Sequence, residues 1–342
     1  MRVTAQRLVA ALALVASLAA GPARAATASA PAPAPAPSSA AAASAPVACP
    51  PGPVVPTHDE VIAAMRVATD HGPLWKATKD GRTVYLYGTI HVARASWMYP
   101  GPRVLSAIRE SDTIALEVDL TDPEMMARLQ KAVLRTPESP VLSEALEKRL
   151  LASMVAACVL PATFAPMRPE MQATTLEVMQ GRGLGLYAEY GIDMFLAGLG
   201  RGMKKPLRSL ETPESQAELL VSDDPAETAR AVVAVLDELE GGKAPAMLKR
   251  LAADWERGDV DDMAAYATWC GCLDTPDKRA DFDKLIVERN PQMVDRIVQW
   301  HGEGQSLFVA VGTLHMVGPI GLPTLLKARG FKVERVSFAD AR

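Results

Sequence analysis

The sequence predicts an α/β fold whose mostly parallel central sheet is assembled from a βαβ unit near each end of the chain, with a large helical insertion between the two units. Three observations support this prediction. A Gly-Thr-x-His pattern occurs twice, at residues 88–91 and 312–315. Each copy follows an apolar, β-rich run, residues 84–87 and 307–311, that is about the length of a buried strand. Each copy then leads into a helical segment and a second strand, which is the element order of a βαβ unit.

The second half of each unit can be placed from local signals. In the first unit, a predicted helix at residues 103–110 precedes an apolar strand at residues 113–118. In the second unit, a predicted helix at residues 322–329 ends at Gly330, a typical helix stop, and a strand follows at residues 331–336.

The insertion between the units, about residues 122–303, shows mainly helical periodicity. A short apolar run at residues 206–210 interrupts the helices, and we expect it to join the sheet as a further strand. Residues 150–167 carry no charge and approach the length of a membrane span. Because this stretch contains two prolines and many small residues, we predict a buried helix that ends near Val159 and is followed by a turn.

The two histidines of the repeated pattern define the predicted site. In a parallel sheet, residues that follow the carboxyl ends of the strands gather at one edge, where open α/β sheets bind their ligands. His91 and His315 follow their strands directly, and Glu117 ends the partner strand of the first unit. A single histidine is more often a capping or buried hydrogen-bonding residue. Because two of the chain's five histidines occupy the same place in a repeat, we predict one shared site with metal-ligand or acid–base chemistry.

Additional charged residues are candidates for the same site. Glu211 ends the predicted short strand, and either Glu211 or Asp193 could act as a second carboxylate. Arg289 is always charged and could hold a substrate carboxylate or a developing oxyanion. Asp119 shares a strand face with Glu117 but could equally cap the helix that begins near residue 122.

The first 25 residues are predicted to be a cleavable signal peptide. Arg2 and Arg7 supply the positive end, residues 8–20 form an apolar core, and Ala25 completes a small-x-small cleavage site. The apolar core is short for a retained membrane anchor. We therefore expect a periplasmic or secreted protein, cleaved after Ala25, without an integral membrane span once the leader is removed.

Residues 26–56 contain nine prolines and no charged residue, which predicts a disordered, Ala/Pro-rich linker; a partner-binding arm is the alternative. The folded part, residues 57–342, is long enough for one large domain or two closely joined ones.

Three of the 36 basic residues lie in the leader, so the mature chain has 33 basic residues against 40 acidic ones and its net charge changes from −4 to −7. This acidic balance, without a basic stretch, argues against a nucleic-acid partner.

Four cysteines remain after leader removal, which is compatible with disulfides in an oxidising compartment. Cys270 and Cys272 are separated by one residue, so zinc-ribbon and thioredoxin-like patterns do not fit. Sequence does not fix connectivity, and we favour a bridge from Cys158 to one member of this pair; Cys49 lies in the linker.

Taken together, these motifs resemble the TraB/GumN family, which includes the TIKI metalloproteases. The resemblance covers about residues 72–338, and beyond the two Gly-x-x-His motifs and the following Glu it rests on Tyr190-Gly191-Ile192-Asp193, Leu210-Glu211-Thr212 with Gln216, Arg289-Asn290 with Met293, and Gly318-Pro319-Ile320-Gly321-Leu322 followed by Gly330-Phe331. It implies kinship with a wider group that contains erythromycin esterases and ChaN-like haem-binding proteins. It also implies that His91, Glu117 and His315 serve metal binding and catalysis, and that Arg289 contacts an anionic or carbonyl group.

The resulting hypothesis is an exported, metal-dependent hydrolase, most similar to a peptidase. Two histidines and a carboxylate around a divalent ion, Mn, Co or Zn, leave a position for water, whose pKa falls from about 15.7 toward about 7 on coordination. The alternatives are an esterase or lactone hydrolase, or an envelope protein that binds haem or metal without turnover. The substrate, a peptide or a small molecule, is not encoded in any recognisable motif.

Overall fold

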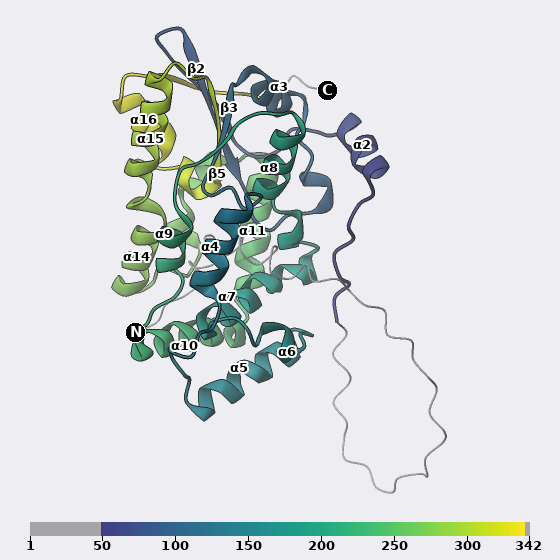
Figure 1. Cartoon of the computed structure of the whole chain (residues 1–342), viewed down its shortest axis with the longest axis vertical. Helices are drawn as coiled ribbons and strands as arrows, with labels where there is room; N and C mark the ends of the chain where they lie inside the picture. The colour runs from purple at the N-terminus through teal and green to yellow at the C-terminus, as the bar shows by residue number, and fades with distance from the viewer. Residues whose placement is uncertain (1–48, 339–342) are drawn as a thin grey trace, which may run out of the picture.

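A computed structural model describes residues 49–338 of the chain (Figure 1). The predicted signal peptide and residues 26–48 of the predicted linker lie outside the described residues. Within the described part of the chain, no helix is both long and apolar enough to cross a membrane.

A six-stranded sheet lies at the centre of the fold, in the order β4-β3-β5-β2-β1-β6. Four neighbouring strands run parallel, as predicted: β4 (Leu207–Ser209), β3 (Thr113–Leu116), β5 (Leu307–Gly312) and β2 (Arg82–Thr89). The remaining strands are β1 (Leu74–Lys79), antiparallel to β2, and β6 (Lys332–Arg335), antiparallel to β1. The expected α/β class and the mostly parallel sheet are confirmed, including the short strand that joins from the insertion.

The strand β1 was missing from the sequence prediction. Asp80 and Gly81, both with positive φ, form a two-residue turn that returns the chain from β1 into β2. Such an Asp-Gly turn is a strong hairpin signal because it matches the twist of the flanking strands. As a consequence, β6 pairs with β1 at the sheet edge, and the two strands of the second βαβ unit are not neighbours.

Helices cover both faces of the sheet. On one face, α15 (Asn290–Gly302) and α16 (Leu322–Ala328) pack against strand side chains, and these helices lie together on the left in Figure 1. On the other face, α3 (Pro102–Glu110) and α8 (Ile192–Gly202) pack against the alternate side chains of the same strands. In β5, for example, Val309 belongs to the first core and Phe308 to the second, as the two-residue period of a strand requires.

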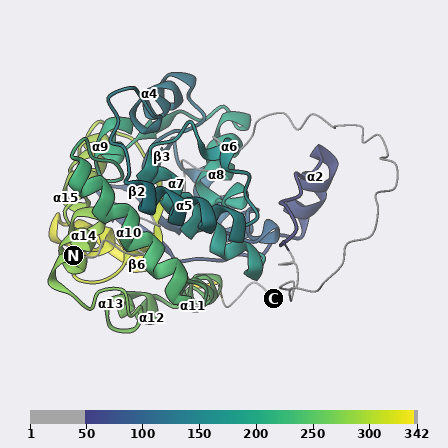
Figure 2. The ribbon, with the colours of Figure 1, turned by 90° about the horizontal axis from the view of Figure 1, so that it is seen from below.

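The rest of the insertion forms a helical layer beyond the second face. Its helices are α4 (Pro123–Val133), α5 (Glu144–Ala156), α6 (Pro161–Phe164), α7 (Pro169–Met179), α9 (Pro213–Glu218), α10 (Pro225–Gly241), α11 (Ala244–Arg257), α12 (Val260–Ala264), α13 (Tyr266–Trp269) and α14 (Pro276–Phe282). Helices α5, α7 and α10 pack against one another below the sheet, as Figure 2 shows from beneath. A short helix, α2 (His58–Arg66), precedes the sheet.

The uncharged stretch 150–167 is not the buried helix that the sequence predicted. Helix α5 does end before the prolines, at Ala156, but only one of its faces is buried, through Leu150 and Met154. Val155 is 67% exposed on the other face. The helix therefore lies at the surface, and its lack of charge does not reflect burial.

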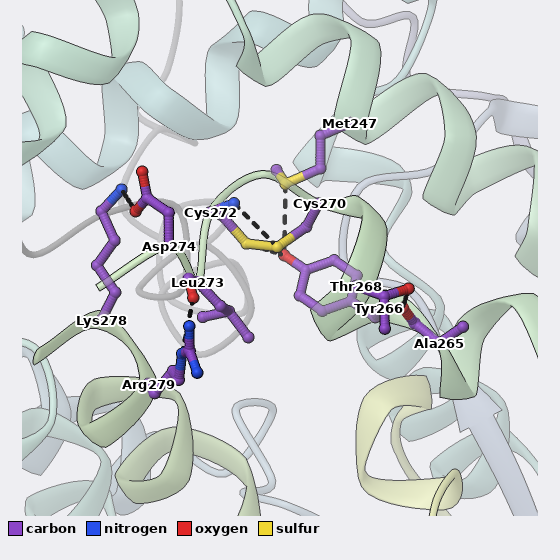
Figure 3. The surroundings of a disulfide bond; sticks show 10 residues. All are labelled: Met247, Ala265, Tyr266, Thr268, Cys270, Cys272, Leu273, Asp274, Lys278 and Arg279. Atoms are coloured by element: carbon purple, nitrogen blue, oxygen red, sulfur yellow. Dashed lines mark hydrogen bonds and ion pairs between the residues drawn. A yellow bond between two sulfur atoms is a disulfide. The ribbon is translucent and has the colours of Figure 1, made fainter. Parts of the chain in front are cut away.

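The disulfide connectivity differs from the prediction. Cys158, just after α5, bonds to Cys49, and Cys270 bonds to Cys272. Figure 3 shows the second bridge beside Tyr266, in a part of the helical layer distant in sequence from Cys158. The first bridge holds the last residues of the predicted linker, which are also fixed by the hydroxyl of Tyr187 donating to the carbonyl of Pro51. The predicted mobile linker therefore does not extend to residue 56.

A buried carboxylate in the helical layer gives a pH-dependent stability. Asp254, 1% exposed at the end of α11, faces Asp262 of α12. Burial, followed by the proximity of Asp262, raises the pKa of Asp254 to about 6. Because the folded state binds this proton more tightly than the unfolded state, the stabilising contribution is complete below about pH 4 and is lost as the pH rises through about 6.

We therefore expect Asp254→Asn to raise the free energy of unfolding at pH 7.5 by about 1–3 kcal/mol. The difference from the parent should shrink as the pH falls toward 4.5, which urea denaturation at several pH values would measure. Asp283→Asn, at an exposed carboxylate, is the matched control and should show no such trend. A difference that did not vary with pH would contradict the assigned ionisation.

Candidate active site

The two Gly-Thr-x-His turns lie side by side at the carboxyl edge of the sheet. Strands β2 and β5 pair in parallel with Thr89 opposite Gly312, so the residues that follow each strand enter the same region. A Cβ at Gly88 would lie 2.7 Å from the hydroxyl oxygen of Thr313, so only glycine permits this approach of the two turns. The indole Nε1–H of Trp255 donates to the Gly88 carbonyl at 2.9 Å and fixes the first turn.

His91 forms a dyad with Asp193. Its Nδ1 lies 2.6 Å from the Asp193 carboxylate, which also accepts a 2.6 Å hydrogen bond from the Thr89 hydroxyl. Because an ionised carboxylate can only accept, the hydrogen of neutral His91 is on Nδ1 and the lone pair is on Nε2. Burial favours the neutral imidazole, but the charge and hydrogen bond of Asp193 outweigh burial and raise the pKa of His91. Asp193 therefore strengthens His91 as a base.

His91 Nε2 is directed toward the interior of the site. It is buried, lies 4.0 Å from Oε1 of Glu117, and has no hydrogen-bond partner within the described residues. Glu117 directly follows β3, as the sequence predicted, and accepts a 2.8 Å hydrogen bond from the backbone amide of Gly312. The second motif therefore holds the carboxylate that faces the histidine of the first motif.

His315 is held by Asn290. The Asn290 side chain donates to the carbonyl of Ile320 at 2.7 Å, so its oxygen faces Nδ1 of His315 at 2.6 Å. This arrangement places the hydrogen of His315 on Nδ1 and the lone pair on Nε2, which lies 3.3 Å from Nη1 of Arg289. Burial, reinforced by the charge of Arg289, lowers the pKa of His315 to about 3, so this imidazole is neutral at physiological pH.

Arg289 occupies the centre of the cluster, between Glu117, Glu211 and His315. Its Nε donates to Glu211 at 2.7 Å, one Nη2 hydrogen donates to Glu117 at 2.6 Å, and the other donates to Glu211. Nη1 donates to the carbonyl of Leu285 at 2.7 Å and lies within reach of His315. A guanidinium has five N–H donors, so all of them are used. An incoming substrate anion would have to displace one of these partners.

The carboxylates of the cluster are paired with this cation. Burial tends to protonate Glu117, but Arg289 and the two histidines lower the pKa of Glu117 to about 2. Gln216 donates to both Glu117 and Glu211, at 3.2 Å each. Glu117 is therefore ionised at physiological pH and held from several sides.

The structure brings together six of the seven residues that the sequence suggested for the site, and two amides join them. Gln216 and Asn290 had entered only through the family resemblance, because an isolated amide carries no chemical signal of its own in the sequence. Asp119, in contrast, lies apart: it pairs with Arg201 at 2.7 Å, and Asp122 caps α4.

A small cavity opens beside His91. The polar part of its lining comes from His91, Glu117, Asp193 and Gln216, and the apolar part from Leu116, Val118, Leu120, Met194 and Ala197. Two buried acceptor atoms of lining residues, Nε2 of His91 and Oε1 of Gln216, have no hydrogen-bond partner among the described residues. A molecule that donates hydrogen bonds, such as water, suits this combination.

Comparison with known proteins agrees with the sequence resemblance. The family model described as the TraB/PrgY/gumN family matches residues 73–335. The chain belongs to this family. No solved structure gives a significant match.

Two relatives of the TraB/PrgY/gumN chain illustrate the range of the family. The uncharacterized protein YbaP of Escherichia coli (strain K12) is 26% identical over 256 residues, covering 72% of this chain and 88% of YbaP. The metalloprotease TIKI1 of Danio rerio is 23% identical over 319 residues, covering 76% of this chain and 62% of TIKI1.

The predicted metal ligands can be tested against this geometry. A divalent ion would need the lone pairs of His91, His315 and Glu117 to converge on one point at about 2.0–2.2 Å. The His315 lone pair instead faces the Arg289 guanidinium, which also contacts Glu117. Within residues 49–338, no three His, Cys, Asp or Glu side chains are arranged to hold a metal. The residues as arranged do not fit the three-ligand site.

Proposed function

We propose that this protein is a hydrolase that cleaves a peptide or related acyl bond with a water molecule activated by His91. The observation that supports this proposal is the buried Nε2 of His91, which lacks a partner among the described residues beside a small polar cavity while Nδ1 is held by Asp193. This is the arrangement of a histidine general base with an orienting carboxylate.

The chemistry follows from the tautomer of His91, which carries its hydrogen on Nδ1 and its lone pair on Nε2. Nε2 of His91 would accept a proton from water while the water oxygen bonds to the acyl carbon. Asp193 would stabilise the imidazolium that forms, without accepting the proton itself. Nε2 would then return the proton to the leaving amine or alcohol as the acyl bond breaks. The balance is one water consumed, one acyl bond broken, and the histidine regenerated.

The other residues of the cluster would set the electrostatic environment of this step. Glu117, whose Oε1 lies 4.0 Å from His91 Nε2, would favour the positive charge that develops on the imidazole. Arg289 would keep Glu117 ionised and would hold both Glu117 and Glu211 in position. The apolar part of the cavity lining, which includes Val118 and Met194, would contact an uncharged side chain or acyl group of the substrate.

We place peptides first among the substrates because one relative is named a metalloprotease. The geometry at His91 serves an ester or lactone equally well, since the attack on the acyl carbon is the same. A substrate screen must therefore include both bond types.

The direct test is hydrolysis by the purified protein of a quenched fluorescent peptide library and of a panel of p-nitrophenyl esters. Each assay would be run with EDTA and with added Mn²⁺, Co²⁺ or Zn²⁺. We expect His91→Gln to lower kcat/KM by at least about 10³-fold on any substrate the parent cleaves. His58→Gln, at an exposed histidine of α2, is the matched control and should match the parent. Equal turnover by the His91 variant would refute the proposal.

A further inference from the structure

We propose that Arg289 is the resident cation of this site and that it excludes divalent metal ions from the position between His315 and Glu117. This inference deepens the proposed function and rests on it, because the exclusion of metal bears on catalysis only in the mechanism proposed above. Metal binding can nevertheless be measured without any substrate, so the two ideas can fail separately.

The first argument is occupancy. Nη1 of Arg289 lies 3.3 Å from Nε2 of His315, and Nη2 lies 2.6 Å from Glu117. Guanidinium groups carry no acceptor, so the His315 lone pair accepts from this N–H. A metal ion bound by the same lone pair would need the guanidinium to leave. Two of the three predicted ligands are therefore already engaged by a cation.

The second argument is that the guanidinium is fixed in place. Glu211 accepts from both Nε and Nη2 along one edge of the guanidinium, and the carbonyl of Leu285 accepts from Nη1 at 2.7 Å. Leu285 belongs to a π-helical turn, Asp283–Val287, which ends just before Arg289. Such turns are rare and occur frequently at functional sites. Arg289 itself is the residue before α15, whose first turn contains Pro291. The backbone therefore presents the side chain to the cluster with its donors already paired.

The third argument is charge balance. Glu117 is a buried carboxylate, 8% exposed at its side chain, and Glu211 is nearly buried at 11%. The guanidinium pairs with both carboxylates through three of its five directed hydrogen bonds. A divalent ion beside it would add two positive charges at contact distance from a third, which is strongly repulsive in a site with little water.

The test is isothermal titration of Zn²⁺, Mn²⁺ and Co²⁺ into the parent and into variants that remove or keep the charge. The parent should show no detectable binding of an ion at the cluster. Arg289→Met removes the charge but keeps much of the length, and we expect it to bind a divalent ion at least about 100-fold more tightly than the parent. Arg289→Lys keeps a positive charge and should behave as the parent. Arg208→Met, at a partly exposed arginine paired with Glu303, is the matched control.

A second variant protects the test against failure of Arg289→Met to fold. Arg289→Met combined with Glu211→Gln restores the charge balance while keeping His91, Glu117 and His315. This double variant should bind one ion per chain, with a rise in Tm that depends on metal concentration, and adding His315→Gln should abolish both. The inference would be overturned if the parent bound one ion that His315→Gln removed. It would also be overturned if the folded double variant bound none.

Discussion

Asp193→Asn is expected to lower kcat/KM by about 10³–10⁴-fold while leaving the fold intact. The hydroxyl of Thr89 donates to Oδ1 of Asp193, and Nδ1 of His91 contacts Oδ2. In the variant, an amide oxygen held by Thr89 places the NH₂ group against Nδ1 of His91. The histidine must then carry its hydrogen on Nε2, so the base faces the cavity in the wrong tautomer.

The matched control for this prediction is Asp119→Asn. Asp119 is also buried near the carboxyl edge of the sheet, but its partner is Arg201 and not a histidine. Its substitution should change kcat/KM by less than about twofold, since it removes no contact of the dyad. Steady-state kinetics on the best substrate from the screen, with circular dichroism for the fold, would make the comparison. A similar loss in both variants would show that the effect is structural and would remove Asp193 from the mechanism.

The positions of the site residues could be predicted because strand ends are readable in sequence. The repeated apolar run and Gly-Thr-x-His place His91 and His315 after β2 and β5, and these strands are neighbours. Glu117 directly follows β3 and Glu211 comes shortly after the end of β4, and the parallel pairing of these strands brings both carboxylates to the same edge. Parallel topology alone therefore determines most of the composition of the cluster.

The roles within the cluster could not be predicted because they depend on side-chain orientation. When an arginine lies near two carboxylates, its sequence context does not tell whether it binds the substrate or other groups of the protein. Only the structure shows that Arg289 uses every donor on Glu117, Glu211, His315 and Leu285. The sequence likewise gives no indication that Asn290 sets the tautomer of His315.

Arg289→Met is expected to lower the free energy of unfolding by about 3–5 kcal/mol. The cost arises because Glu117 and Glu211 would remain buried without a compensating charge, not because the ion pair itself is worth that much. Urea denaturation at pH 7.5 in the presence of EDTA would measure the change. Arg208→Met is the matched control: its partner is Glu303, their side chains are 34% and 42% exposed, and its loss should cost less than about 1 kcal/mol.

Adding Glu211→Gln to Arg289→Met separates the cost of uncompensated buried charge from the loss of the ion pair itself. Because it removes the excess buried charge, the double variant should be more stable than Arg289→Met alone by about 1–3 kcal/mol. A double variant as unstable as the sum of the two single variants would contradict this coupling. Since a buried pair of this kind contributes little net stability compared with apolar residues of similar size, its presence needs a chemical explanation. Keeping Glu117 ionised and correctly placed beside His91 provides one.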